Sequence, residues 1–115
     1  MSIASDLIRG HTDTIILALL VGGDNYGYEI NKSIQLRTGG KYELKEATLY
    51  TAFRRLEQAG CISSYWGDEQ TGARRRYYSI TDTGRSTYAN LISEWKIAKA
   101  MIDNLIETEE EDDGR

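Results

Sequence analysis

Apolar residues recur at intervals of three and four positions over most of this chain, which is the spacing of amphipathic helices. The first such stretch covers residues 3–20 and predicts one helix that ends at Gly22-Gly23, because glycine favours helix ends. A second helix is expected over residues 26–38, before Gly39-Gly40. Its expected capping residues are Asp24 and Asn25, and its expected inward side chains are Tyr28, Ile30 and Ile34.

The second half of the chain predicts two helices separated by a hairpin. A third helix is expected over residues 45–59, and the segments Ile62–Trp66 and Arg76–Ile80 are rich in the β-branched and aromatic residues of strands. A last helix is expected over residues 81–107, with Thr81 as its N-cap. Three helices, a hairpin and a final helix are the layout of a winged helix-turn-helix. We therefore expect a mainly α fold with a small β-hairpin and one long C-terminal dimerisation helix.

The third helix has one apolar face and one polar face. Leu49, Phe53 and Leu56 lie within a narrow arc and are expected to face the core. Small residues, hydroxyls, an amide and two arginines cover the rest, and these side chains suit the major groove of DNA. An ordinary solvated helix face is the alternative. The expected contact residues on this helix are Lys45, Ala47, Thr48, Tyr50, Thr51, Arg54, Arg55 and Gln58.

The hairpin carries three consecutive arginines, Arg74, Arg75 and Arg76, which are also expected to bind DNA. Alternate strand residues point to opposite sides, so Arg74 and Arg76 can share one side. Guanidinium groups on such a wing reach phosphates or the minor groove. The alternative for Arg75 is an ion pair across the hairpin with Asp68 or Glu69.

The last helix has apolar residues at alternating steps of three and four, which is the pattern of a coiled-coil seam. A helix of about 25 residues is near 38 Å long, more than a small three-helix head covers. We expect a two-fold homodimer that binds a pseudo-palindrome, and a monomer with the seam folded back is the alternative. The expected interface residues are Ile8, Ile15, Leu91, Trp95, Ala98, Ile102 and Leu105, and Tyr88 begins the seam.

The composition of the 115 residues fits one domain, and 40% of them are hydrophobic. No apolar run approaches the roughly 20 residues that span a bilayer, and no secretion pattern opens the chain, so no membrane partner is expected. A single cysteine, Cys61, forms no internal disulfide and favours a cytoplasmic location. We expect its thiol to be a small buried apolar group rather than a redox sensor.

The net charge of −4 is unfavourable for a DNA-binding protein until its distribution is considered. Six acidic residues lie within 107–113, and residues 1–106 carry 12 acidic and 13 basic residues. The chain thus divides into a winged-helix domain over residues 1–80, the dimerisation helix over 81–107 and an acidic tail over 108–115. We expect the tail to be disordered, with a DNA-mimicking or autoinhibitory role as the alternative.

Three segments together resemble the PadR-type family of transcriptional regulators. They are residues 46–60, the hairpin over residues 67–78 and the entry to the last helix over residues 80–84. The resemblance covers nearly all of the chain except the acidic tail, and the length is similar to that of the short subfamily. It implies a homodimeric winged-helix protein that binds double-stranded DNA and acts as a repressor.

Residues 63–69 and Trp95 are similar to those of a multidrug-binding repressor in this family. The likeness implies a flat pore at the dimer centre, where paired tryptophans hold planar aromatic molecules; simple filling of space by Trp95 is the alternative. Lys99 replaces an acidic residue of that repressor, so anionic or neutral aromatics are expected to bind best. The pore residues implied are Leu7, Gly10, Asp13, Thr14, Tyr88, Leu91, Ile92, Trp95 and Lys99.

An enzyme is not expected, because His11 is the only histidine and no catalytic set, metal-ligand cluster or phosphate-binding loop occurs in the sequence. No cofactor or metal is expected either. Two further hypotheses remain: a DNA-binding regulator without a small-molecule ligand, and a winged-helix module that binds only proteins.

Overall fold

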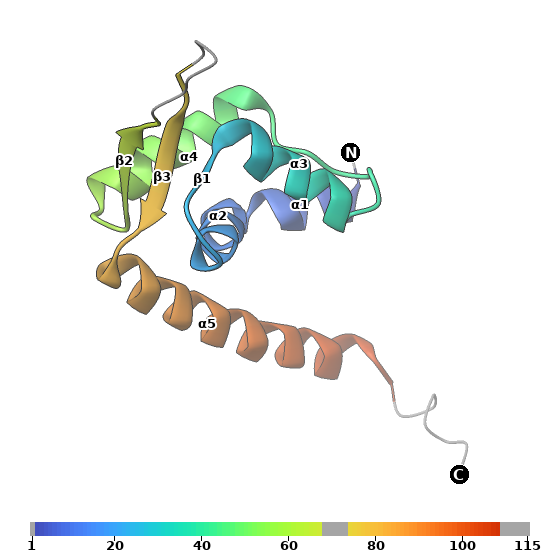
Figure 1. The fold of residues 1–115 in the computed structure, drawn as a ribbon. Helices are drawn as coiled ribbons and strands as arrows, with labels where there is room; N and C mark the ends of the chain where they lie inside the picture. Colours follow the sequence, from blue (N-terminus) through green and yellow to red (C-terminus); the bar gives the residue numbers. More distant parts are fainter. Residues whose placement is uncertain (1, 68–73, 109–115) are drawn as a thin grey trace.

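The computed structural model describes residues 2–67 and 74–108 of the chain, and within these ranges it contains five helices and three strands. They follow in the order α1 (Ile3–Arg9), α2 (Thr12–Val21), β1 (Asn25–Tyr26), α3 (Gly27–Arg37), α4 (Glu46–Gln58), β2 (Ile62–Trp66), β3 (Arg76–Ile80) and α5 (Asp82–Ile106). The first four helices and the sheet form a head, and α5 passes beneath it (Figure 1). The mainly helical fold with a long last helix is confirmed.

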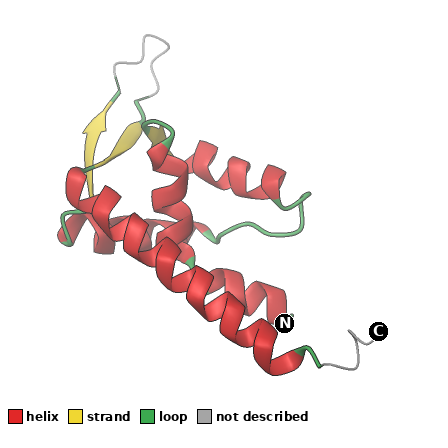
Figure 2. Cartoon of the chain, turned by 90° about the horizontal axis from the view of Figure 1, so that it is seen from below, coloured by secondary structure: helices red, strands yellow, loops and turns green. Residues whose placement is uncertain are grey.

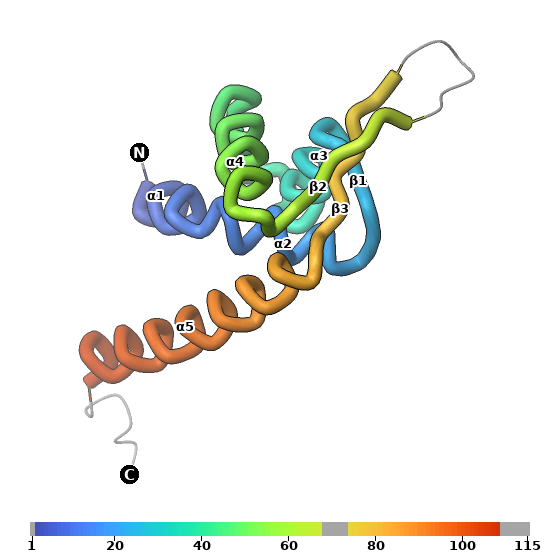
Figure 3. The backbone as a smooth tube through the Cα atoms, turned by 90° about the vertical axis from the view of Figure 1, so that its left-hand side faces the viewer, coloured from blue at the N-terminus to red at the C-terminus, as the bar shows by residue number. Residues whose placement is uncertain are grey.

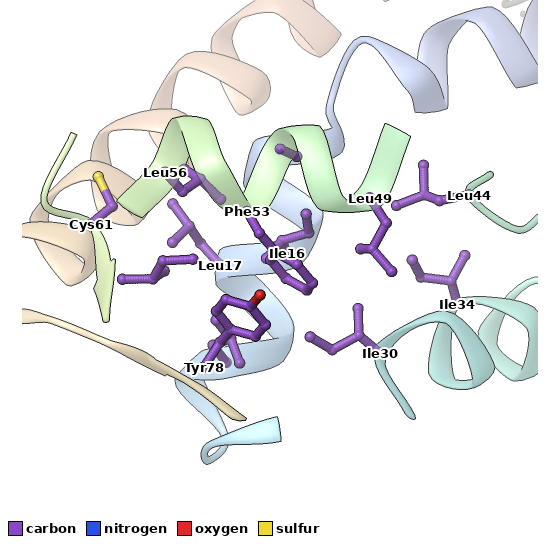
Figure 4. Packing of buried hydrophobic residues seen from close by; sticks show 13 residues of the cluster. Ile16, Leu17, Ile30, Ile34, Leu44, Leu49, Phe53, Leu56, Cys61 and Tyr78 are labelled. Atoms are coloured by element: carbon purple, nitrogen blue, oxygen red, sulfur yellow. The ribbon is translucent and has the colours of Figure 1, made fainter. Parts of the chain in front are cut away.

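The core lies between α2, α3, α4 and the sheet (Figure 4). From α4 it takes Leu49, Phe53 and Leu56, as the helical spacing predicts. Phe53 stacks on Tyr78 of β3, with ring centroids 3.9 Å apart and an interplanar angle of 17°. This stack fixes the sheet against α4.

The two predicted strands form an antiparallel hairpin, hereafter the wing, in which Ile62 pairs with Ile80 and Trp66 with Arg76. A third strand, β1, pairs with β3 and makes the sheet order β1-β3-β2. The sequence prediction missed β1, because a strand of two residues is too short to show an alternating pattern.

The single helix predicted over residues 3–20 is wrong: the structure divides it into α1 and α2 at Gly10 and His11. Glycine has a low helix propensity, and the hydroxyl of Thr12 donates to the Arg9 carbonyl at 2.7 Å where the last carbonyls of α1 lack helical partners. The break leaves Ile16, Leu17 and Leu20 of α2 fully inside the core.

The predicted start of the second helix also needs correction. Neither Asp24 nor Asn25 caps α3, whose N-cap is Tyr26. The side chain of Asn25 instead accepts from the Tyr26 amide, and β1 occupies the predicted cap region. Tyr28 was expected to face inward but is 68% exposed, whereas Ile30 and Ile34 are buried as predicted.

The last helix begins as predicted, with the Thr81 hydroxyl accepting from the Gly84 amide at 3.0 Å. Its first turn packs on Cys61, which is buried as expected. Its C-terminal half projects in the opposite direction from the wing (Figure 3). Exposed apolar side chains accumulate in this half, and they are Ile97, Met101, Ile102, Leu105 and Ile106.

Despite the 25 residues of α5, no helix in the described ranges has the length and hydropathy that crossing a bilayer requires.

Candidate nucleic-acid interface

Helix α4 is held in place through the loop that precedes it. The Asn31 side chain of α3 donates to the Leu44 carbonyl at 2.7 Å and accepts from the Leu44 amide at 2.8 Å. Leu44 itself is buried in the core. These bonds hold the loop before α4 against α3.

The outward face of α4 is the surface that the sequence predicts for DNA. Most of the predicted residues are exposed there, and Thr48 is half-buried. The exposed ones are Lys45, Ala47, Tyr50, Thr51, Arg54, Arg55 and Gln58. Small and polar side chains without an apolar cluster permit close approach to a base-pair edge.

Arg55 differs from its neighbour Arg54, because its guanidinium is bound within the chain. It forms an ion pair with Asp13 of α2, and its Nε donates to Asp13 Oδ2 at 3.2 Å. The hydrogen bond to Asp13 raises the pKa of Arg55, so the charge on this arginine is kept. The pair connects α4 with the start of α2, a contact that no local sequence pattern indicates.

At the root of the wing, the arginines are arranged on aromatic rings. The Arg74 guanidinium lies 4.9 Å from the centroid of the Trp66 ring, and that of Arg76 lies 5.9 Å from it. The Arg75 guanidinium lies 4.9 Å from the Tyr26 ring. As predicted from strand alternation, Arg74 and Arg76 share one side of the wing.

Arg76 connects the wing to α4. It donates to the Ser64 hydroxyl at 2.8 Å and lies 3.7 Å from the Glu57 carboxylate, to which Ser64 also donates. The contacts of Arg76 therefore favour a structural role over the predicted contact with DNA. The alternative pairing of Arg75 with Asp68 or Glu69 lies outside the described residues.

On the other side of the wing, a row of tyrosines anchors it to β1. Tyr65 stacks on Tyr77 at 5.6 Å, and Tyr77 meets Tyr26 edge-on at 5.3 Å. The Tyr65 hydroxyl donates to Asp24 at 2.6 Å, and this hydrogen bond raises the pKa of Tyr65. The row fixes the direction in which the wing leaves the head.

A cavity of about 500 Å³ lies between α5 and the junction of α1 with α2. Figure 2 shows these helices from below, with α5 crossing the head near the N-terminal helix. His11 meets Trp95 edge-on inside it, with ring centroids 4.8 Å apart and an angle of 70°. The Asp13–Arg55 ion pair forms part of the same wall.

The cavity contains some of the predicted pore residues, and they are Leu7, Gly10, Asp13, Thr14, Leu91 and Trp95. Tyr88, Ile92 and Lys99 do not line it, and the Lys99 ammonium lies 3.6 Å from Asp103. The sequence did not predict five further lining residues. Three of them lie at the junction of α1 with α2, one on α4 and one on α5, and they are Arg9, His11, Thr12, Arg55 and Glu94. Ala98 and Ile102, predicted for the dimer interface, also line it.

Comparisons with known proteins agree with this architecture. Residues 16–90 match the model of the transcriptional regulator PadR-like family. A transcriptional regulator from Clostridium thermocellum superposes with a TM-score of 0.84 and 49% identity, covering 92% of this chain and 100% of that one. A PadR family transcription regulator from Clostridium difficile gives a TM-score of 0.72 and 35% identity, over 84% and 98% of the two chains. An uncharacterized protein of Lysinibacillus sphaericus is 46% identical over 105 residues, which are 91% of this chain and 96% of that protein.

Proposed function

This chain belongs to the PadR-like family of DNA-binding transcriptional regulators, and from that premise we propose that it is a homodimeric repressor of the cytoplasm. It binds a pseudo-palindromic operator, with one α4 and one wing on each half-site. The observation that carries the proposal is the exposed polar face of α4 beside arginines held on the rings of the wing.

Two of the arginines predicted for DNA, Arg54 and Arg74, have different roles in this proposal. Arg54, on the exposed face of α4, contacts a base edge, and Arg74 contacts phosphate. Arg54→Ala is expected to cost about 1–3 kcal/mol and to relax the preference at one base position. Arg74→Ala weakens binding to every sequence and reduces the slope of affinity against salt by about one. Electrophoretic shifts with the promoter of its own gene, over a salt series, measure both effects.

Arg85→Ala is the matched control, because Arg85 is exposed on α5 and lies outside the α4 and wing surface. Parent-like binding by both Arg54→Ala and Arg74→Ala contradicts the assignment of surfaces. A folded parent that binds no duplex at low salt favours the protein-interaction module instead.

The homodimer follows from apolar surface that one chain leaves uncovered. Leu105 is 80% exposed and Ile106 69% exposed at the end of α5. An apolar groove of about 240 Å³ lies on the head between α1, α2 and α3, and Ile8 and Ile15 line it. Burying a large aliphatic side chain contributes about 1.5–3 kcal/mol. The partner's α5 seated on this groove covers both surfaces through a two-fold axis.

A planar aromatic ligand in the Trp95 cavity is the second part of the proposal, in line with the multidrug-binding repressor that the sequence resembles. The His11 and Trp95 rings meet at 70° and are not stacked on one another, and an indole in a cavity wall can stack on a flat molecule. Glu94 and Asp13 place carboxylates in the wall, whereas Lys99 is paired with Asp103 outside it. Arg9 and Arg55 also line the wall, but their guanidinium groups are paired with Asp6 and Asp13. We therefore propose cationic or neutral aromatics in place of the anionic or neutral ones expected from the sequence.

The Asp13–Arg55 pair supports control of DNA binding by such a ligand. Asp13 lines the cavity and Arg55 lies on the recognition helix α4, so one ion pair belongs to both sites. A cationic ligand that takes up Asp13 changes the partner of Arg55, and by linkage DNA then changes ligand affinity by the same factor.

Fluorescence of the Trp66→Phe variant isolates Trp95, because the chain has two tryptophans. We expect quenching by the planar cation acridine orange and weaker quenching by anilinonaphthalene sulfonate. Because Trp95→Ala removes the reporting indole, its expected loss of binding is followed by the fluorescence of the dye itself. If neither dye quenches the fluorescence of Trp66→Phe, the ligand is removed from the proposal, and the protein is a regulator without a small-molecule effector.

A further inference from the structure

A second groove, of about 480 Å³, lies where the root of the wing meets α3 and α4. Five aromatic residues and three arginines line it, and no acidic residue is among its lining within the described ranges. The aromatic residues at its rim are exposed, with Tyr28 at 68%, Trp66 at 53% and Tyr50 at 41%. Positive charge together with aromatic surface fits a ligand that is anionic in one part and apolar in another.

The register of the wing shows which way this groove faces. Trp66 pairs with Arg76, and Ser64 pairs with Tyr78, so these residues lie on one side of the hairpin. Tyr78 stacks on Phe53 of α4, which identifies this side as the one that packs against the helix. Trp66 continues the same side beyond the core, and the groove therefore adjoins the helix that carries the predicted base contacts.

The rim of the groove on the side of α3 and α4 is preorganised. A Cβ at Gly27 would lie 2.5 Å from the Tyr50 hydroxyl oxygen, so only glycine lets Tyr50 approach the first turn of α3 this closely. The Tyr50 ring is also held edge-on to Phe53, with centroids 5.4 Å apart. Arg74 is oriented by the Trp66 ring. Groups fixed in this way lose little conformational entropy on binding.

We propose that this groove holds one sugar–phosphate unit of the DNA backbone beside the bases that α4 contacts. Arg74 binds the phosphate, the hydroxyls of Tyr28 and Tyr50 donate to its oxygens, and Trp66 packs against the deoxyribose. The inference rests on the proposed function and adds Tyr28 and Trp66 to the binding surface. The sequence analysis expected Tyr28 to face the core, and it gave Trp66 no role of its own.

The test is a double-mutant cycle between the protein and single phosphates. The probe is a duplex that the parent protein selects from a random-sequence library, remade with one neutral methylphosphonate at each backbone position in turn. One methylphosphonate is expected to weaken the parent, and the same substitution should weaken both variants less. Tyr28→Phe already lacks one hydrogen bond to that phosphate, and Trp66→Ala lacks the ring that orients Arg74.

Salt dependence separates the roles of these side chains. Tyr28→Phe is expected to lower affinity about fivefold with an unchanged salt slope, since a neutral hydrogen bond is lost but no charge is removed. Arg74→Ala reduces the slope by about one. Leu36→Ala is the control, since Leu36 is exposed on α3, the helix that carries Tyr28, but does not line the groove. Circular dichroism verifies that each variant is folded.

The outcomes distinguish this inference from the function on which it rests. If the parent binds the selected duplex but no methylphosphonate position couples to Tyr28 or Trp66, the groove is not a backbone site and the regulator proposal stands. If the library yields no duplex that the parent binds, both proposals fail.

Discussion

Arginine is abundant on the proposed DNA surface, but the fold gives its individual arginines different tasks. Arg55 is paired with Asp13, and Arg76 is tied to Glu57 and Ser64. The sequence indicates which face of a helix or strand a residue occupies, but it does not show a partner that is 42 positions away. The exposed face of α4 was therefore predicted correctly, while the internal partners of Arg55 on α4 and of Arg76 on β3 were not.

Tyr78 gives a prediction at the scale of one side chain. Burial raises its pKa above the ordinary 10.0, so above that pH the unfolded chain releases a proton that the folded chain retains. The folded state then binds more protons, and the free energy of unfolding falls as pH rises. In Tyr78→Phe, which keeps the stack on Phe53, this decline is expected to be smaller. Urea unfolding at about pH 8 and about pH 11 measures it.

Tyr28→Phe is the control for this measurement, because Tyr28 is 68% exposed and outside the core. It should follow the alkaline decline of the parent. Equal declines in Tyr78→Phe and the parent would show that the Tyr78 phenol contributes nothing to the alkaline loss of stability.

At the scale of elements, the accuracy of the sequence prediction depended on length. The α5 helix and the two wing strands have repeated patterns and were placed correctly. Strand β1 and the break between α1 and α2 depend on pairing with β3 and on a single turn, neither of which has periodicity. The predicted set of residues around the Trp95 cavity was incomplete for the same reason, because the break between α1 and α2 brings His11 to Trp95.

The contact between α5 and the head gives a prediction about Gly84. A Cβ there would lie 2.0 Å from the Cys61 carbonyl oxygen, which is backbone and also accepts from the Thr81 amide. Gly84→Ala is expected to destabilise by about 3 kcal/mol or more and to lower the melting temperature by about 10 °C or more. Calorimetry measures both.

Gly22→Ala is the matched control. Gly22 has φ of −79°, and the nearest atom to an added Cβ is 4.0 Å away. This substitution is expected to leave stability unchanged or to raise it by about 0.4–1 kcal/mol. A Gly84→Ala variant as stable as Gly22→Ala would mean that α5 is free to move away from Cys61.

At the scale of the whole molecule, the proposed dimer depends on the exposed end of α5. Leu105→Lys puts a charge into an apolar interface at a cost of about 3 kcal/mol, which weakens association by more than about 100-fold. Sedimentation equilibrium should then give a mass near the 13.0 kDa of one chain, whereas the parent gives twice that value.

Asn104→Lys introduces the same charge at an exposed polar residue one position away, about 100° around the helix from Leu105, and should remain dimeric. Monomers for the parent and both variants would contradict the proposed dimer and favour a seam that folds back on its own head.

A single residue, Thr81, separates the end of β3 from the start of α5. Thr81 is itself fixed, with its hydroxyl donating to the Gly60 carbonyl at 2.6 Å. The connection between the wing and α5 therefore allows little change in their relative orientation. In the proposed dimer, α5 sets the separation of the two wings as a rigid spacer would. Changes confined to α5 would re-space the half-sites that a lineage of such regulators recognises, while each half-site sequence stays under the control of α4.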